Sequence, residues 1–171
     1  MTASIRALRA ARLVLALTAA LAVAACSTNK TEEGVPGAGG LGAAGAASPG
    51  SAQDFVVNVG DRVFFESDSS DLTPTATATL DKQARWLGQY PRYAITMEGH
   101  ADERGTREYN FALGARRAQV ARDYLASRGV PASRIRTTSF GKERPVAVCD
   151  DISCWSQNRR AVTVLNGAAG S

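Results

Sequence analysis

The chain has 171 residues, and its 20 Lys and Arg against 16 Asp and Glu give a formal net charge of +4. Three of the basic residues, Arg6, Arg9 and Arg12, precede an apolar run at the N-terminus; without them 17 basic residues stand against 16 acidic ones, a net charge of +1. So small a charge excludes the strong positive field on which nucleic-acid binding depends.

The N-terminal segment has the pattern of a bacterial lipoprotein signal. Residues 13–25 form an apolar run too short to span a bilayer as a helix, and they end at Val23-Ala24-Ala25-Cys26. This ending is similar to a lipobox, which predicts cleavage before Cys26 and a covalent lipid on that cysteine. An ordinary secretory signal beside an incidental cysteine is the alternative. Residue 27 is Ser rather than Asp, which by analogy with bacterial sorting favours the outer membrane, with the protein facing the periplasm.

These observations divide the chain into three parts. Residues 1–25 are the predicted signal peptide, and residues 26–53 are the lipidated cysteine and a flexible tether. The tether is rich in Gly, Ala, Ser, Thr and Pro, so it buries too little apolar surface to offset the entropy lost on ordering. Residues 54–168 remain for one domain with one core.

Predicted helices and strands alternate along this domain. Thr73 and Pro74 are typical of a helix start, and this helix stops near residue 90. A second helix covers residues 107–127 and ends before Gly129. The pattern predicts strands at residues 55–57 and 62–65 (a pair or one broken strand), 93–97, 135–140 and 161–165. This order indicates an α/β (α+β) fold with both helices packed on one side of a sheet.

Cys149 and Cys154 flank a short loop near the C-terminus. In an exported protein the compartment is oxidising, so a disulfide is favoured. A metal site is the rival interpretation, and it is weak because the chain has one histidine, far away in sequence, and no second cysteine pair. We therefore predict no metal and no cofactor apart from the lipid on Cys26.

Arg117 stands in an unexpected place on the second predicted helix. At about 100° per residue it falls within the apolar arc, between Leu113 and Ala121 and close to Asn110. A buried arginine needs a partner, and Asp102 in the preceding loop is a candidate. Two hypotheses follow: a salt bridge that ties the loop to the helix, or a site for a ligand carrying both an ammonium and a carboxylate.

Catalysis is a third hypothesis for this region, because His100, Asp102 and Glu103 lie close together in sequence. No nucleophile with a nearby base is evident, and a lone histidine in a loop is more often a hydrogen-bonded turn residue. We therefore predict that the chain is not an enzyme.

The run EGHADERGT at residues 98–106, followed by Asn110 and Arg117 and by Asn158-Arg159-Arg160, resembles the OmpA-like peptidoglycan-binding domain family. Within that family the chain is most similar to its peptidoglycan-associated lipoproteins. The resemblance covers residues 60–166 and implies a β-α-β-α-β sandwich with helices on one side of a mixed sheet. It also implies that Asp102 and Arg117 hold the diaminopimelate of the peptidoglycan stem peptide.

The resemblance implies further site residues: Arg104, Gly105, Thr106, Asn110, Leu113 and Phe65. Leu113 is equally consistent with a plain core position, and Glu66 stands where the family usually has Asp. Asn158 and Arg159 match residues near the family's site, or they cap a helical turn around Trp155. The implied partners are peptidoglycan, the outer membrane, TolB and TolA, with a role in envelope integrity and cell division. A wall-binding lipoprotein outside the Tol system is the alternative.

Overall fold

The computed structural model describes residues 47–167. The predicted signal peptide, Cys26 and most of the predicted tether lie outside these residues. Within residues 47–167, none of the helices has the length and apolarity that crossing a membrane requires.

A four-stranded mixed sheet forms one layer of the domain. Its strand order is β1-β4-β2-β3, with β2 and β3 parallel and the other pairs antiparallel. The strands are β1 (Arg62–Phe64), β2 (Ala94–His100), β3 (Ile135–Gly141) and β4 (Arg160–Asn166). In register, Met97 of the central strand β2 lies opposite Thr137 of β3 and Thr163 of β4.

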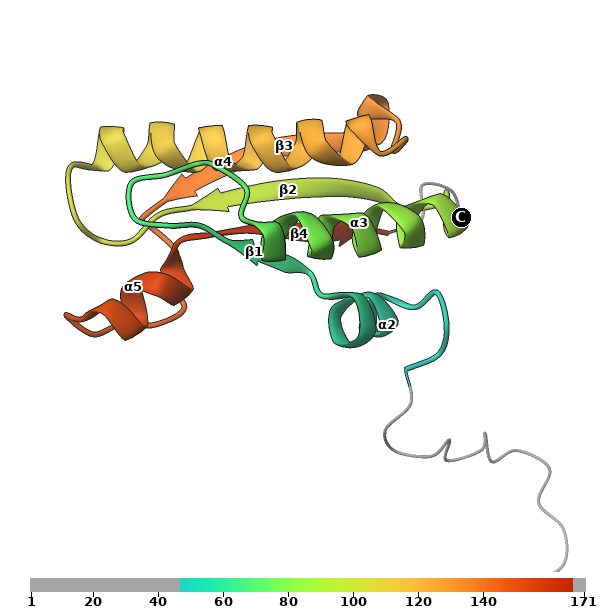
Figure 1. Cartoon of the computed structure of the whole chain (residues 1–171), viewed down its shortest axis with the longest axis horizontal. Helices are drawn as coiled ribbons and strands as arrows, with labels where there is room; N and C mark the ends of the chain where they lie inside the picture. Colours follow the sequence, from blue (N-terminus) through green and yellow to red (C-terminus); the bar gives the residue numbers. More distant parts are fainter. Residues whose placement is uncertain (1–46, 168–171) are drawn as a thin grey trace, which may run out of the picture. The chain divides into compact units, whose positions relative to one another are not determined.

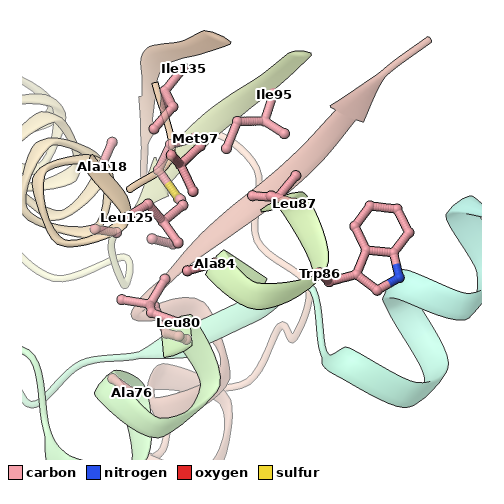
Figure 2. Close-up of a cluster of buried hydrophobic side chains, with 14 of the residues drawn as sticks. Ala76, Leu80, Ala84, Trp86, Leu87, Ile95, Met97, Ala118, Leu125 and Ile135 are labelled. Atoms are coloured by element: carbon pink, nitrogen blue, oxygen red, sulfur yellow. The ribbon is translucent and has the colours of Figure 1, made fainter. Parts of the chain in front are cut away.

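Two long helices, α3 (Pro74–Gln89) and α4 (Arg107–Ser127), form the second layer. Thr73 caps α3 by accepting a hydrogen bond from the Ala76 amide at 3.1 Å, and Pro74 follows at the first helical position, as predicted. Both helices bury side chains in the same core as Met97 of β2. Leu80 and Leu87 of α3, Leu125 of α4 and Met97 of β2 belong to one cluster of buried side chains, drawn in Figure 2. The predicted fold class, with both helices on one side of a mixed sheet, is confirmed.

Four shorter elements complete the described residues 47–167. They are α2 (Ala52–Asp54), a π-helical turn η1 (Phe55–Val59), a 3-10 turn η2 (Ala132–Arg134) and α5 (Ile152–Asn158). Helix α5 and the loops that precede α3 and α4 gather at one end of the sheet, on the left in Figure 1.

The predicted strand at residues 55–57 is wrong. These residues belong to the helical turn η1, in which Phe55 is buried and its ring lies 4.9 Å from that of Trp86. Val56 and Val57 are exposed, so the run of three apolar residues does not mark a buried strand. Local capping by Ser51, which accepts from the Asp54 amide at 3.0 Å, favours the helical turn instead.

The ordered fold also begins earlier than residue 54. The Gly50 carbonyl accepts hydrogen bonds from Arg92 Nη2 at 2.7 Å and from the Tyr93 hydroxyl at 2.9 Å. The Gly50 amide donates to Asp54 Oδ2 at 2.8 Å. Residues 50–53, part of the predicted tether, are therefore held against the domain.

Two glycines set the distance between α4 and the sheet. A Cβ at Gly99 of β2 would lie 1.8 Å from the Gly114 carbonyl oxygen, and a Cβ at Gly114 would lie 2.5 Å from Ser139 Oγ. Helix and strand therefore approach each other more closely than any side chain permits. This contact positions the start of α4, and the loop before it, over the end of β2.

Candidate functional site

The loop between β2 and α4 presents the predicted site residues. It leaves the sheet at Ala101, whose amide donates to the Gly141 carbonyl at 2.8 Å. Gly105 has φ 85°, a conformation that favours glycine, and Thr106 then caps α4 by accepting from the Tyr109 amide at 3.2 Å. The predicted roles of Gly105 and Thr106 in binding remain predictions, but the structure gives both residues a part in shaping the loop.

Asp102 is buried in this loop and is bonded to two arginines. Its carboxylate accepts from the Arg104 amide at 3.2 Å and from Arg104 Nη2 at 2.7 Å. Arg159 Nη1 lies 3.3 Å from Oδ2 of the same carboxylate. Burial alone would raise the pKa of Asp102, but the hydrogen bonds from Arg104 and Arg159 outweigh it and lower the pKa below its ordinary value. Asp102 is therefore an anion that is already surrounded by donors.

Arg117 is fully buried, as its place in the apolar arc predicted. Its guanidinium donates to three backbone carbonyls, those of Ser69 and His100 at 2.8 Å each and that of Glu66 at 3.1 Å. It also lies over the ring of Phe65, 5.2 Å from the centroid. Burial lowers the pKa of Arg117 to about 10, and the nearby Asp102 carboxylate opposes that shift. Arg117 thus ties residues 66–69 to the end of β2.

The salt bridge considered between Asp102 and Arg117 is not formed in the part of the chain that the structure describes. Backbone carbonyls satisfy the buried guanidinium, and other arginines satisfy the carboxylate. Every residue has a backbone carbonyl, so the spacing of side chains in the sequence does not show which carbonyls bind Arg117.

Arg159, which the resemblance matched to a residue near the family's site, contacts Asp102 directly. Besides its contact with Asp102, its Nε donates to the Phe65 carbonyl at 3.0 Å, and its own carbonyl accepts from the Phe65 amide at 2.9 Å. Arg159 therefore joins β1, the start of β4 and the loop that holds Asp102. Its only sequence signal was its place in the Asn158-Arg159-Arg160 block, directly before a strand.

Arg104 is the most solvent-accessible cation of this group, with 43% of its side chain exposed. Its guanidinium lies 4.3 Å from the centroid of the Trp155 ring and donates to Ser67 Oγ at 2.8 Å. The Trp155 indole N–H in turn donates to the Glu103 carboxylate. Contacts with Trp155 of α5 and with Ser67 therefore hold the Arg104 guanidinium at Asp102.

Three other predicted residues lie around this group. Asn110 is buried, and its Nδ2 donates to the Arg104 carbonyl at 2.7 Å. Phe65 is buried beneath the Arg117 guanidinium, whereas Leu113 is buried on α4. Asn110 and Phe65 thus contact the segments that carry the charged groups. The predicted contact of all three residues with a ligand remains a prediction.

Asn158 lies in the helical turn around Trp155, as one of the two alternatives had it, whereas the position of His100 differs from the prediction. Asn158 is buried, and its side chain accepts from the amides of Val146 and Ala147 at 2.8 and 3.2 Å and donates to the Ala147 carbonyl at 2.7 Å. His100 is not a turn residue: it ends β2, is buried, and stacks on Phe140 with 5.5 Å between ring centroids. Burial first, and then the charges of nearby arginines, lower the pKa of His100 to about 4.

Cys149 and Cys154 form a disulfide. Cys149 lies in the loop that precedes α5, and Cys154 lies within that helix. Asp151 lies near both sulfur atoms, so these three residues are the ones that a metal would use. With the two sulfurs bonded to each other, neither is the thiolate that a metal site requires.

At the end of the sheet the buried Asp102 carboxylate pairs with Arg104 and Arg159, and the charge of the buried Arg117 guanidinium lies nearby. Such a group can hold an ammonium at the acid and a carboxylate at the guanidinium groups. The model of the OmpA family matches residues 64–159, more than half of the chain. The chain belongs to the OmpA family.

Several relatives in this family share more than half of their aligned residues with this chain. The peptidoglycan-associated lipoprotein of Rhizobium meliloti is 74% identical over 121 residues, which are 71% of this chain and 69% of that protein. The protein of the same name from Pseudomonas aeruginosa is 52% identical over 98 residues, 57% of each chain. The predicted resemblance is confirmed. These names describe lipoproteins rather than enzymes, in agreement with the expectation that this chain is not an enzyme.

Solved structures agree on the fold. The crystal structure of the peptidoglycan-associated lipoprotein from Burkholderia pseudomallei has a TM-score of 0.60 and 40% identity, covering 62% of this chain and 90% of that one. The C-terminal domain of Helicobacter pylori MotB has the same TM-score of 0.60 at 22% identity, covering 64% of this chain and 86% of that domain, so it supports the fold alone.

Proposed function

We propose that this OmpA family member is an outer-membrane lipoprotein that binds peptidoglycan non-covalently through the diaminopimelate of the stem peptide. The observation that carries the proposal is the buried Asp102 carboxylate, 2.7 Å from Arg104 Nη2 and 3.3 Å from Arg159 Nη1, at an end of the sheet where three loops meet. The names of the related proteins, peptidoglycan-associated lipoproteins, support peptidoglycan as the polymer that is bound.

Binding of the ligand would exchange one cation at Asp102 for another, because Arg104 occupies that carboxylate now. In the unliganded domain its guanidinium stands in the place that a ligand ammonium takes at Asp102. When the ligand ammonium replaces it, Arg104 is released to hold the carboxylate of the same ligand, with the buried charge of Arg117 behind it. Because Arg117 is covered, its direct contact with the ligand requires residues 66–69 to move aside.

This exchange explains selectivity for a zwitterionic group. Diaminopimelate carries an ammonium and a carboxylate at the end of its side chain, whereas lysine carries the ammonium alone. A stem peptide with lysine would displace Arg104 from Asp102 without giving the guanidinium a new anion, which leaves a charged donor unpaired.

Anchoring and avidity complete the proposed role. A lipid on Cys26 would hold the chain in the outer membrane, and a flexible tether of about 23 residues, up to Gly50, would span roughly 26 Å root-mean-square. Many tethered copies on one polymer bind by avidity, so a single site need not be strong. By family resemblance, the protein would work with TolB and TolA in envelope integrity and in outer-membrane constriction at division.

Calorimetry with the tripeptide Ala–Glu–meso-diaminopimelate tests the binding site. Asp102→Asn is expected to weaken binding about 30-fold or more, the usual cost of truncating one partner of a buried charge pair. Arg104→Ala is expected to weaken binding less, because this side chain is partly exposed. Arg117→Ala is expected to weaken it too, with circular dichroism to check that the variant is folded. Arg116→Ala is the matched control, because Arg116 is the exposed neighbour of Arg117. If the site variants bind as well as the parent, the site is wrong.

A pull-down with purified TolB tests the Tol assignment separately. Capture of the wild-type domain would support a role in the Tol system. A domain that binds the tripeptide but not TolB would instead be a wall-binding lipoprotein outside that system.

A further inference from the structure

The Trp155 ring supports the Arg104 side chain at the edge of the Asp102 site. The Arg104 guanidinium lies 4.3 Å from the centroid of this ring, and tryptophan is the side chain that makes the strongest cation–π contact. Trp155 is half-buried. The chain has two tryptophans, and the other one, Trp86, is buried in the core. Trp155 is therefore the tryptophan that can act at the site.

The indole ring is held by the loop beneath it and by its own helix. Its N–H donates to the Glu103 carboxylate, and the Cys149–Cys154 disulfide ties down the neighbouring residue of α5. Asp151 caps the helix by accepting from the Ser153 amide at 2.7 Å. A helix of seven residues is marginal on its own, so these bonds are what fix it. The ring is thus in place before any ligand binds.

The remaining contacts of the Arg104 guanidinium are hydrogen bonds. Nη2 donates to Asp102 Oδ2 at 2.7 Å and to Ser67 Oγ at 2.8 Å, and Nε donates to Asp102 Oδ1 at 3.2 Å. Hydrogen bonds depend steeply on distance and angle, so a shift of about 2 Å breaks them. A cation–π contact needs only a position over the ring within about 6 Å of its centroid. The stacking contact is therefore the one that Arg104 can keep while it changes partners.

We propose that Trp155 is a positioning residue for ligand binding, which keeps the Arg104 guanidinium over its ring while the ligand ammonium replaces that guanidinium at Asp102. The inference rests on the proposed function and assigns part of its selectivity to α5. An unsupported arginine side chain would lose much rotamer entropy on binding the ligand carboxylate. Because the Trp155 ring already restricts Arg104, less entropy is lost when that carboxylate binds.

This role makes the contribution of Trp155 depend on the second carboxylate of the ligand. With diaminopimelate, Arg104 has to stay ordered in the complex, so the Trp155 ring strengthens binding. With lysine at the same position, the released guanidinium has no anion to meet and gains nothing from being held. A side chain that only kept α5 folded would affect the two ligands alike.

Calorimetry with two tripeptides, carrying meso-diaminopimelate or lysine at the third position, tests the role. Every variant is made in the chain that remains after the predicted cleavage before Cys26, and circular dichroism checks its fold. Trp155→Leu removes the ring and is expected to weaken binding of the diaminopimelate tripeptide about fivefold, the size of one cation–π contact at an exposed site. Binding of the lysine tripeptide is expected to change by less than about twofold.

Two further variants isolate the ring. Trp155→Phe keeps an aromatic face without the indole N–H, so it is expected to retain most of the wild-type affinity. Ile152→Ala is the matched control and is expected to bind as the wild type does, because Ile152 is an exposed apolar residue of the same helix.

Tryptophan fluorescence gives a second readout. The exchange moves a cation over the Trp155 ring, so the emission of the wild type is expected to change when the diaminopimelate tripeptide binds. Trp155→Phe is expected to bind the same peptide without this change, because Trp86 stays buried in the core. An emission change of the same size in Trp155→Phe would contradict the proposed movement of Arg104.

Equal affinity of the wild type and Trp155→Leu for the diaminopimelate tripeptide would overturn the positioning role and leave the proposed function intact. An equal loss for both tripeptides would also overturn it, and so would a Trp155→Phe variant that binds as weakly as Trp155→Leu. In either case the effect would come from the packing of α5. A wild-type chain that binds neither tripeptide would overturn the proposed function together with this role.

Discussion

Arg159 Nη1 lies 3.3 Å from Asp102 Oδ2, whereas Arg117 Nη1 donates to the His100 carbonyl at 2.8 Å. The cation expected to face Asp102 therefore holds backbone instead, and a residue 57 positions away in sequence supplies the ion pair. Arg159 therefore neutralises part of the Asp102 charge and also stabilises the site through its bond to the Phe65 carbonyl.

Arg159→Met removes this buried pair while keeping most of the side-chain volume. We expect the free energy of unfolding to fall by about 3 kcal/mol, because Asp102 loses a partner and the Phe65 carbonyl loses a donor. Denaturant unfolding measures the change. Arg116→Met at an exposed position is the control and should change stability by less than about 0.5 kcal/mol. A similar small effect of Arg159→Met would show that Arg104 alone satisfies Asp102.

Gly99→Ala tests the close approach of α4 to β2. The new Cβ would lie 1.8 Å from the Gly114 carbonyl oxygen, so we expect a loss of about 3 kcal/mol or more. Gly88→Ala is the matched control, because a Cβ there meets nothing within 4 Å and alanine favours the helix by about 0.5 kcal/mol. Thermal unfolding of both variants measures the difference. Equal melting temperatures would contradict the packing described here.

His100 is expected to make stability depend on pH. Its folded pKa is lowered from 6.5 to about 4, so between these values the unfolded chain binds the proton and the folded domain does not. The free energy of unfolding should therefore fall as the pH drops from about 6.5 towards 4, by up to about 3 kcal/mol. Denaturant unfolding at several pH values checks this, and His100→Gln should flatten that part of the profile. An unchanged slope in His100→Gln would assign the pH dependence to other groups.

The Cys149–Cys154 disulfide closes a short loop, so its expected contribution is modest. Replacement of both cysteines by serine should lower the free energy of unfolding by about 2 kcal/mol. Mass spectrometry of the exported protein should also find this loop about 2 Da lighter than its reduced form, because one pair of hydrogens is lost. Free thiols in the exported protein would contradict the disulfide.

Local patterns predicted most of the fold. The Thr73-Pro74 start, the end of α4 near Ser127 and the four main strands follow from capping residues and apolar periodicity, which act over a few positions. The error at residues 55–57 arose because three adjacent apolar residues suit a strand or a helical turn, and contact with Trp86 decides between them.

The charged group at the sheet end was only partly predictable. The apolar arc of α4 predicted that Arg117 is buried, because one helix contains all the necessary information. Its carbonyl partners, and the pairing of Arg159 with Asp102, depend on loops that meet only in the folded domain. The contact between Trp155 and Arg104 likewise joins two segments that are far apart in sequence.

The most direct measurement of the central claim compares two tripeptides on the wild-type domain by calorimetry. One carries meso-diaminopimelate and the other carries lysine at the same position. Because the released Arg104 guanidinium needs the second carboxylate, we predict that the diaminopimelate peptide binds at least about 30-fold more tightly. Equal affinity for the two peptides, or no binding of either, would contradict a site built for a zwitterionic residue at Asp102.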